Sequence, residues 1–198
     1  MMELLTFGDT GWGDELLLSM VMTILVSTSS LAFGLLIGTI FASFKLSNSY
    51  ILKTIAEFYT TVVRGVPELL VIYLLFFGGS GAVMYVAKIF GHMGYIELSP
   101  FTIGTIAVGA ISGAYSTEVI RGAILAVPKG QFEAARTLGM KKYALSFTII
   151  FPQVARLALP GIGNVWQVTL KDTALISVTG LVEIMRQSKI AAGSTHEP

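Results

Sequence analysis

The sequence predicts an all-α membrane protein, a polytopic bundle of transmembrane helices that forms a single domain over residues 1–198. Hydrophobic residues make up 54% of the chain and charged residues only 13%, and the mean hydropathy is +0.75. A soluble domain carries about 25% charged residues, so this chain has too few to cover a surface that faces only water. The apolar residues are also concentrated in long runs without charge. Much of the surface is therefore expected to face a lipid bilayer.

The residue types and motifs that the chain lacks exclude several classes of function. There is no cysteine, so disulfides, thiolate metal sites and cysteine nucleophiles are excluded together. The two histidines, His92 and His196, are isolated and give no metal site. No phosphate-binding loop, zinc-protease motif or nucleophile elbow is present, so we expect no enzyme, no ATPase and no cofactor. A net charge of +1 argues against a nucleic-acid surface.

The first predicted span, about residues 16–44, is free of charge and lies between Glu15 and Lys45. A bilayer core of about 30 Å needs about 20 apolar residues in a helix, so this run is long enough to cross it with room for tilt. Acidic residues and no basic residue precede the run. A secretory signal begins with a basic segment, so we interpret the run as a span and not as a signal peptide.

The second predicted span, about residues 55–79, contains two charged residues, Arg64 and Glu68. They are four positions apart, so on a helix they share a face and could form an ion pair. Gly65 and Pro67 loosen the helix between them, and the glycines at its far end are expected to terminate it. Charged residues inside a membrane are costly and often functional, so both are candidates for contacting a solute or lining its pathway. A buried structural pair is the alternative.

Two further spans are predicted, at about residues 98–118 and 144–170. The second of these contains prolines and glycines, so we expect it to be bent or broken. Such a break is tolerated at membrane depth only where it is buried in protein or lines a cavity. Lys171 and Asp172 follow this span and either line a pathway or cap a bent helix. After them, a weaker apolar segment at about residues 174–185 could re-enter the membrane.

The distribution of basic residues predicts the orientation of the chain. Positive loops stay in the cytoplasm, so the N-terminus is predicted outside and the loop at about residues 121–143 inside. Glu118 and Arg121 are expected to pair at the helix end that enters this loop. The basic residues on the cytoplasmic side are Lys45, Lys53, Arg121, Lys129, Arg136, Lys141 and Lys142, against Lys88 on the other side.

The cytoplasmic loop contains a predicted short amphipathic helix. It begins at Pro128, which suits a first helical turn, and ends near Gly139, which can adopt the left-handed cap conformation. Apolar residues at spacings of three and four give the helix one apolar face. Ala134, Ala135 and Gly139 are small, so they allow another surface to approach closely.

Glu133, Ala134 and Ala135, followed by Gly139 and by the segment I-I-F-P at 149–152, resemble the EAA loop of the membrane subunits of binding-protein-dependent ABC importers. The family pattern usually has leucine in place of the phenylalanine. In that family the loop is a coupling helix that docks in a cleft of a cytoplasmic ATPase, and closure of the ATPase dimer moves the spans through it. The resemblance implies that Glu133, Ala134, Ala135 and Gly139 contact an ATPase subunit.

Three more segments resemble the polar amino-acid subgroup of this family. They are R-G-V-P-E-L-L at 64–70, S-G-A-Y-S-T-E at 112–118, and K-D-T-A-L at 171–175, where the subgroup has serine in place of alanine. The resemblance implies the fold of a type I ABC importer permease in the bacterial inner membrane. The implied partners are a dimeric ABC ATPase, a second permease subunit, identical or related, and a periplasmic solute-binding protein. The implied solute is a polar amino acid or a derivative such as an opine.

Members of the subgroup normally carry one more apolar span beyond the position of Pro198, and the residues from Ala191 onward form a polar, loop-like end. We therefore expect four spans, with the C-terminus outside. Two other functions stay open. One is a truncated membrane fragment that does not transport. The other is an ion-coupled secondary transporter, although such proteins are built from repeats that flank broken helices and no convincing internal repeat is present.

Overall fold

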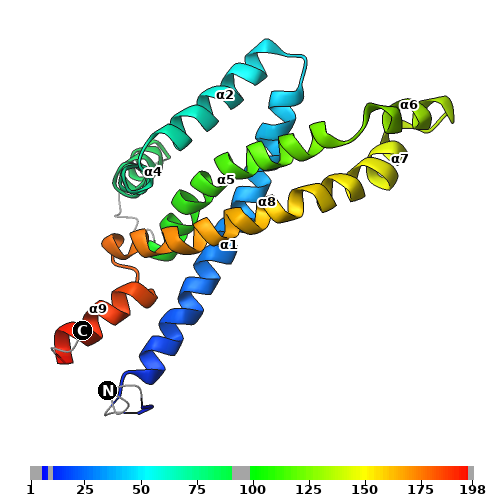
Figure 1. Ribbon diagram of the computed structural model, residues 1–198. Coiled ribbons are helices and arrows are strands. Elements are labelled where there is room, and N and C mark those ends of the chain that lie inside the picture. The colour runs from blue at the N-terminus through cyan, green and yellow to red at the C-terminus, as the bar shows by residue number, and fades with distance from the viewer. Residues whose placement is uncertain (1–5, 9–10, 91–98, 196–198) are drawn as a thin grey trace.

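The computed structural model describes residues 6–8, 11–90 and 99–195, and most of them are helical (Figure 1). Both histidines and the first residue of the third predicted span lie outside the described residues. No strand occurs in the part of the chain that the structure describes, which agrees with the all-α class. By length and composition, 3 of the described helices could cross a membrane, or 4 if a bent pair of helices is one span.

Helix α1, Gly13–Leu46, carries its large apolar side chains outside and its small ones inside. Leu18, Ile24 and Leu36 are exposed. Small residues inside let neighbouring helices approach closely, and large apolar residues outside suit contact with lipid, so the pattern is that of a span. The buried positions of the helix are Ser19, Thr23, Val26, Ser27, Ser30, Gly34, Gly38 and Ala42.

Helix α5, Pro100–Ala126, packs along α1 and is the most enclosed of the candidate spans. Glycines and serines bring the two backbones together. A side chain at Gly34 would overlap the hydroxyl of Ser112, and a Cβ at Gly38 would lie 2.7 Å from that of Ser116. The Ser112 hydroxyl also donates a hydrogen bond to a backbone carbonyl of α1 at 3.2 Å. The buried core beside this contact consists of Val26, Ile72, Ala107, Val108, Ile111, Ile176 and Leu181.

The second predicted span is a bent pair of helices. Helix α2, Tyr50–Gly65, and the helical segment that begins with α3, Glu68–Tyr73, enclose an angle of 112°. Pro67 accounts for the bend, because it lacks an N–H group and forces the residue before it out of the helical conformation. That residue, Val66, is extended, with φ −107° and ψ 142°.

The glycines at the end of predicted span 55–79 do not terminate the helix, so that prediction is wrong. After α3 the chain continues through a π-helical turn, η2 (Leu74–Gly78), into α4 (Gly79–Ile89). A glycine lowers helix stability by about 1 kcal/mol but does not remove a hydrogen-bond donor, so it weakens a helix without ending it. The segment after the bend is therefore longer than predicted.

The third span also extends beyond its predicted limit at residue 118, because α5 continues to Ala126. Arg121 is therefore part of this helix, and the predicted loop of residues 121–143 begins only after Ala126. The loop contains one short helix, α6, at Lys129–Thr137.

The fourth predicted span, residues 144–170, is one continuous helical segment from Lys142 to Thr179. Of the two alternatives predicted for it, a bent or a broken span, the break is therefore wrong. Its irregularities are local changes of helix type. The π turn ends at Ile150, two residues before Pro152, and Pro160 lies inside the following helix without ending it. The segment consists of α7 (Lys142–Ala144), the π turn η3 (Leu145–Ile150), α8 (Phe151–Asp172) and the 3-10 turn η4 (Thr173–Thr179).

The last helix, α9 (Ile184–Thr195), packs against α1. Gly180 turns the chain at φ +101°, and the buried carboxylate of Glu183 accepts hydrogen bonds from two N–H groups of the first turn of α9, at 2.9 and 2.8 Å. Another N–H of this turn donates to Thr23 of α1 at 3.1 Å. The prediction of a loop-like end from Ala191 is wrong, because the capped and anchored helix continues past it.

Candidate functional site

The predicted short helix in the long loop is present as α6. Pro128 immediately precedes it, and Gly139 follows it at φ +72°, the left-handed conformation that suits a glycine there. The N–H of Met140 donates to the carbonyl of Ala135 at 3.1 Å and closes the C-terminal turn. The predicted end near Gly139 is confirmed, and the helix begins one residue later than predicted, at Lys129, with Pro128 as the residue that precedes it.

Helix α6 presents three of the four predicted coupling residues to the outside. Glu133, Ala134 and Gly139 are exposed, and a Cβ at Gly139 would meet no other atom within 4 Å. Ala135 faces inward, at 1% exposed, where α6 rests against η3. Glu133 forms no ion pair with any residue that the structure describes. In Figure 1, α6 stands at the tip of the pair formed by α5 and α8, so its outer face is open to a partner.

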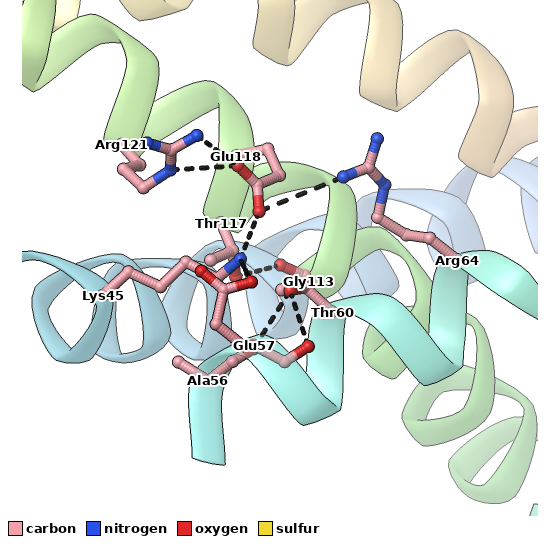
Figure 2. Close-up of polar contacts among 9 residues, drawn as sticks. All are labelled: Lys45, Ala56, Glu57, Thr60, Arg64, Gly113, Thr117, Glu118 and Arg121. Atoms are coloured by element: carbon pink, nitrogen blue, oxygen red, sulfur yellow. Dashed lines mark hydrogen bonds and ion pairs between the residues drawn. The ribbon is translucent and has the colours of Figure 1, made fainter. Parts of the chain in front are cut away.

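A second group of polar side chains joins α1, α2 and α5 (Figure 2). Glu118 is at its centre. Its Oε1 accepts from Lys45 Nζ at 2.5 Å, and its Oε2 accepts from Arg121 Nε at 3.0 Å and lies 2.9 Å from Arg121 Nη2. Lys45 Nζ also lies 3.3 Å from Glu57 Oε2, and Arg64 Nη1 lies 4.0 Å from Glu118 Oε1. Because the Lys45 side chain is only 5% exposed, these carboxylates are what stabilises its charge.

The sequence predicts only part of this cluster. The pair of Glu118 with Arg121 is confirmed, and it forms between residues of one helix. Lys45 is 73 residues away from Glu118 and was missed. A usable signal was present, because Lys45 and Glu118 each end a charge-free stretch long enough to cross the bilayer. Two spans that run in the same direction and end at one membrane boundary can bring such residues together.

Arg64 and Glu68 do not pair, contrary to the prediction from their spacing. The bend at Pro67 separates the two helices that carry them, so each meets other groups. Arg64 Cζ lies 5.5 Å from the centroid of the Tyr115 ring, which is a cation–π contact. The Tyr115 hydroxyl donates to Glu68 Oε1 at 3.5 Å. Tyr115, which sequence reasoning missed, therefore links the two charged residues across the bend.

The two charged residues at the end of α8 have different surroundings. Asp172 is buried, at 6% exposed, whereas Lys171 is exposed. The Asp172 side chain makes no capping hydrogen bond to the 3-10 turn that follows it, so the capping role that the sequence left open does not apply. Glu68 begins α3, and α3 contacts the 3-10 turn η4 that directly follows Asp172. Two carboxylates, from α3 and α8, are thus brought to the same inner region beside Tyr115.

Two hollows meet at Arg64, Tyr115 and Glu118. The larger has a volume of about 520 Å³ and lies between α1, α2 and α5, with Lys45 and its partners in its lining. The smaller, about 260 Å³, lies between α5 and α8 and includes Asn164. No group of three or more His, Asp or Glu residues that could hold a metal ion occurs in the described ranges. The lining residues of both hollows offer charge pairing and hydrogen bonding.

Comparison with known proteins assigns these features to a family. The family model for the inner membrane component of binding-protein-dependent transport systems matches residues 34–194. The chain belongs to this family. The match includes the exposed helix α6, the charged cluster and both hollows, so the resemblance inferred from the motifs is confirmed.

Several relatives of this permease are similar over nearly its whole length. It is 53% identical over 198 residues to the nopaline transport system permease protein NocQ of Agrobacterium fabrum, covering 100% of this chain and 84% of that protein. It is 50% identical over 196 residues to the octopine transport system permease protein OccQ of Rhizobium radiobacter, covering 99% and 83%. It is 42% identical over 188 residues to the histidine/lysine/arginine/ornithine transport system permease protein HisQ of Escherichia coli, covering 95% and 82%.

A solved structure also agrees with the fold of the permease. The crystal structure of an amino acid ABC transporter with histidines contains a chain that superposes with a TM-score of 0.76 at 32% sequence identity, covering 93% of this chain and 81% of that chain. The predicted helix-bundle fold of an importer permease is thereby confirmed.

Proposed function

We propose that this permease is the membrane-spanning subunit of an ATP-driven importer for a polar amino acid or an opine, and that α6 couples it to a separate ATPase. The solute class is supported by the relatives named for nopaline, for octopine and for histidine, lysine, arginine and ornithine. Coupling is supported by one observation above all: Glu133, Ala134 and Gly139 form an exposed surface at the tip of the bundle. We place the protein in the bacterial inner membrane, with the N-terminus outside and α6 in the cytoplasm.

The assembly that we propose contains two permease chains, this one and a second that is identical or related, with a dimeric ATPase and a periplasmic solute-binding protein. The exposure of the long segment Lys142–Thr179 supports a second permease, because only 11% of its most apolar stretch is buried within the chain. Neither a cofactor nor a nucleic acid takes part. The ATPase acts from the side of α6, and the binding protein acts from the opposite side.

The position of α6 explains how motion reaches the spans. The helix lies between the end of α5 and the start of the segment that contains α8, and it is seated on η3 through the buried Ala135. Closure of the ATPase dimer would therefore displace the ends of α5 and α8 together. These two helices bound the smaller hollow, so their displacement changes its shape and its access to either side.

We assign solute contact to the inner carboxylates of Glu68 and Asp172, with Tyr115 between α3 and α8. A carboxylate forms strong, charge-assisted hydrogen bonds with an ammonium or guanidinium group, and every amino acid brings at least one such group. Arg64 lies on the other side of the Tyr115 ring and bounds this region. Lys171 is exposed on α8, so we assign it no contact with the solute.

Co-purification tests the coupling surface. The permease is tagged in cells that express its whole transport system, and the ATPase recovered with it is quantified for the unchanged chain, Gly139→Asp and Gly139→Asn. Both variants place a similar side chain at a left-handed position that Asn and Asp tolerate, but only Gly139→Asp adds a charge to the docking surface. We expect Gly139→Asn to retain most of the ATPase and Gly139→Asp to lose it.

The opposite results would contradict the proposal. If the two variants and the unchanged chain recover equal amounts of ATPase, the surface around Gly139 is not the docking site. If no ATPase is recovered with a folded, membrane-inserted chain and uptake follows an ion gradient, the protein is an ion-coupled transporter. If neither ATPase nor uptake is found, it is a fragment that does not transport.

A further inference from the structure

The larger hollow carries one more positive charge than its acidic residues neutralise. Its ionisable lining consists of Lys45, Arg64, Arg121, Glu57 and Glu118. Arg121 forms a two-point pair with Glu118, and Lys45 lies between Glu118 and Glu57. The charges of these four side chains balance, which leaves one excess positive charge, that of Arg64, whose ion pair with Glu118 is a longer contact of 4.0 Å.

The guanidinium group of Arg64 has most of its donors free. Its nearest carboxylate oxygen, on Glu118, is 4.0 Å away, which is beyond hydrogen-bond distance. Its other contact is the cation–π contact with the face of the Tyr115 ring. That contact leaves the N–H groups in the plane of the guanidinium without an acceptor. The side chain is 44% exposed, and a Cβ at the neighbouring Gly65 would meet nothing within 4 Å, so the hollow is open beside it.

The hollow lies at the depth of the lipid headgroups. On α5, the charge-free stretch from Pro100 to Thr117 rises about 27 Å, close to the ~30 Å thickness of a bilayer core. Glu118 directly follows it, just as Lys45 directly follows the charge-free stretch of α1. Both residues therefore emerge from the hydrocarbon at one boundary, on the side where α6 and the basic loop lie.

The geometry points to a binding site for the phosphodiester group of an anionic phospholipid in the larger hollow, with Arg64 as its main ligand and Thr61 in the same lining. The one excess positive charge of the lining matches the single negative charge of a phosphodiester. Basic pockets between spans on the cytoplasmic side of membrane proteins bind such headgroups. A bound headgroup would bridge α2 to the ends of α1 and α5, whatever solute the protein carries.

A soluble phosphate offers similar chemistry but fits the site less well. A phosphate monoester carries about 1.5 to 2 negative charges at neutral pH and calls for a second free cation. The other cations of the hollow, Lys45 and Arg121, are already paired with carboxylates. The experiment therefore compares the two sources directly.

Native mass spectrometry of the complete detergent-purified transporter measures the binding. The complex is titrated with phosphatidylglycerol, with zwitterionic phosphatidylethanolamine, and with phosphatidylglycerol in the presence of inorganic phosphate. Arg64→Gln removes the free charge, and Arg64→Lys keeps it. Glu57→Gln removes a carboxylate that repels the headgroup at a side chain 65% exposed. Arg156→Gln, at an exposed arginine of α8, is the control for general loss of positive charge.

We expect phosphatidylglycerol to bind in preference to phosphatidylethanolamine, and Arg64→Gln to weaken it about tenfold, the effect of one charge-assisted contact. Arg64→Lys should retain most of the affinity, Glu57→Gln should increase it severalfold, and Arg156→Gln should leave it within about twofold of the unchanged protein. The expected increase in lipid affinity with Glu57→Gln keeps the test decisive even if Arg64→Gln does not fold. If Arg64 had only a structural role, loss of the Glu57 carboxylate would not increase lipid binding.

Three outcomes would overturn the inference. Equal losses with Arg64→Gln and Arg156→Gln would show that lipid binding is general surface electrostatics. Unchanged or weaker binding with Glu57→Gln would show that the headgroup does not enter this hollow. Displacement of the lipid by millimolar inorganic phosphate would assign the site to a soluble anion. Solute uptake is measured separately, so failure of the lipid site leaves the transport proposal intact.

Discussion

Glu118→Gln is predicted to destabilise the permease far more than the same substitution at Glu57. Both changes replace a carboxylate with a neutral amide of the same shape. Glu118 accepts charge-assisted contacts from Lys45 and, twice, from Arg121, and its side chain is 22% exposed. Glu57 has one ion pair, to Lys45, and is 65% exposed.

The magnitudes follow from these contacts. A hydrogen bond to a charged group is worth about 1 kcal/mol more than a neutral one, so three contacts give about 3 kcal/mol for Glu118→Gln, reduced to about 2–3 kcal/mol by partial exposure. The buried Lys45 would then depend on Glu57 alone. For Glu57→Gln, the loss of one exposed pair is worth about 0–1 kcal/mol.

Thermal unfolding in detergent, followed by the loss of the monodisperse peak on size-exclusion chromatography, measures the difference. In a chain of this size, 1 kcal/mol corresponds to about 2–4 °C in Tm. We expect Glu118→Gln to lower Tm by about 4–12 °C and Glu57→Gln to lower it by no more than about 4 °C. Equal shifts, or a larger shift for Glu57→Gln, would refute the reasoning that Glu118 is the centre of the cluster.

Three other predictions test separate parts of the structure. Gly34→Ala should destabilise the contact between α1 and α5 by about 1–3 kcal/mol, because the new methyl overlaps the Ser112 hydroxyl. The control, Gly193→Ala at an exposed position of α9, should not lower Tm. Ala135→Asp buries a charge under α6 and should reduce the yield of folded protein, whereas Ala134→Asp on the exposed face should leave the yield unchanged and abolish ATPase recovery. Asp172→Asn should raise the KM for a cationic solute about tenfold with little change in Tm, and an unchanged KM in uptake assays would remove Asp172 from the pathway.

Features that depend on local chemistry were predictable from the sequence. The charge-free stretches predicted α1 and α5, and Pro128 and Gly139 indicated where α6 begins and ends. The bend at Pro67 was anticipated only as a loosened helix, although the effect of proline on the residue before it accounts for the full 112° turn. Each of these signals lies within a few residues of the feature that it determines.

Features that depend on distant residues were missed or wrongly predicted. The predicted pairing of Arg64 with Glu68 is wrong, because a spacing of four residues brings two side chains together only if the helix continues between them. The true partners, Tyr115 and Glu118, come from another span, and no pattern near Arg64 indicates them. The predicted break in the fourth span is wrong, because proline and glycine do not always interrupt a helix. Here the helix accommodates Pro160 and changes its turn type before Pro152.

ATP-dependent uptake into proteoliposomes is the most informative measurement of the proposed function. The permease would be reconstituted with its partner permease, its ATPase and its solute-binding protein, and the uptake of arginine, histidine, octopine and nopaline would be compared for the unchanged chain and for Glu133→Ala. We predict that at least one of these solutes accumulates only when ATP is supplied on the side of α6, and that Glu133→Ala abolishes this uptake while the assembled complex still forms a folded bundle. Uptake that proceeds without ATP, or that is unaffected by Glu133→Ala, would contradict coupling through α6.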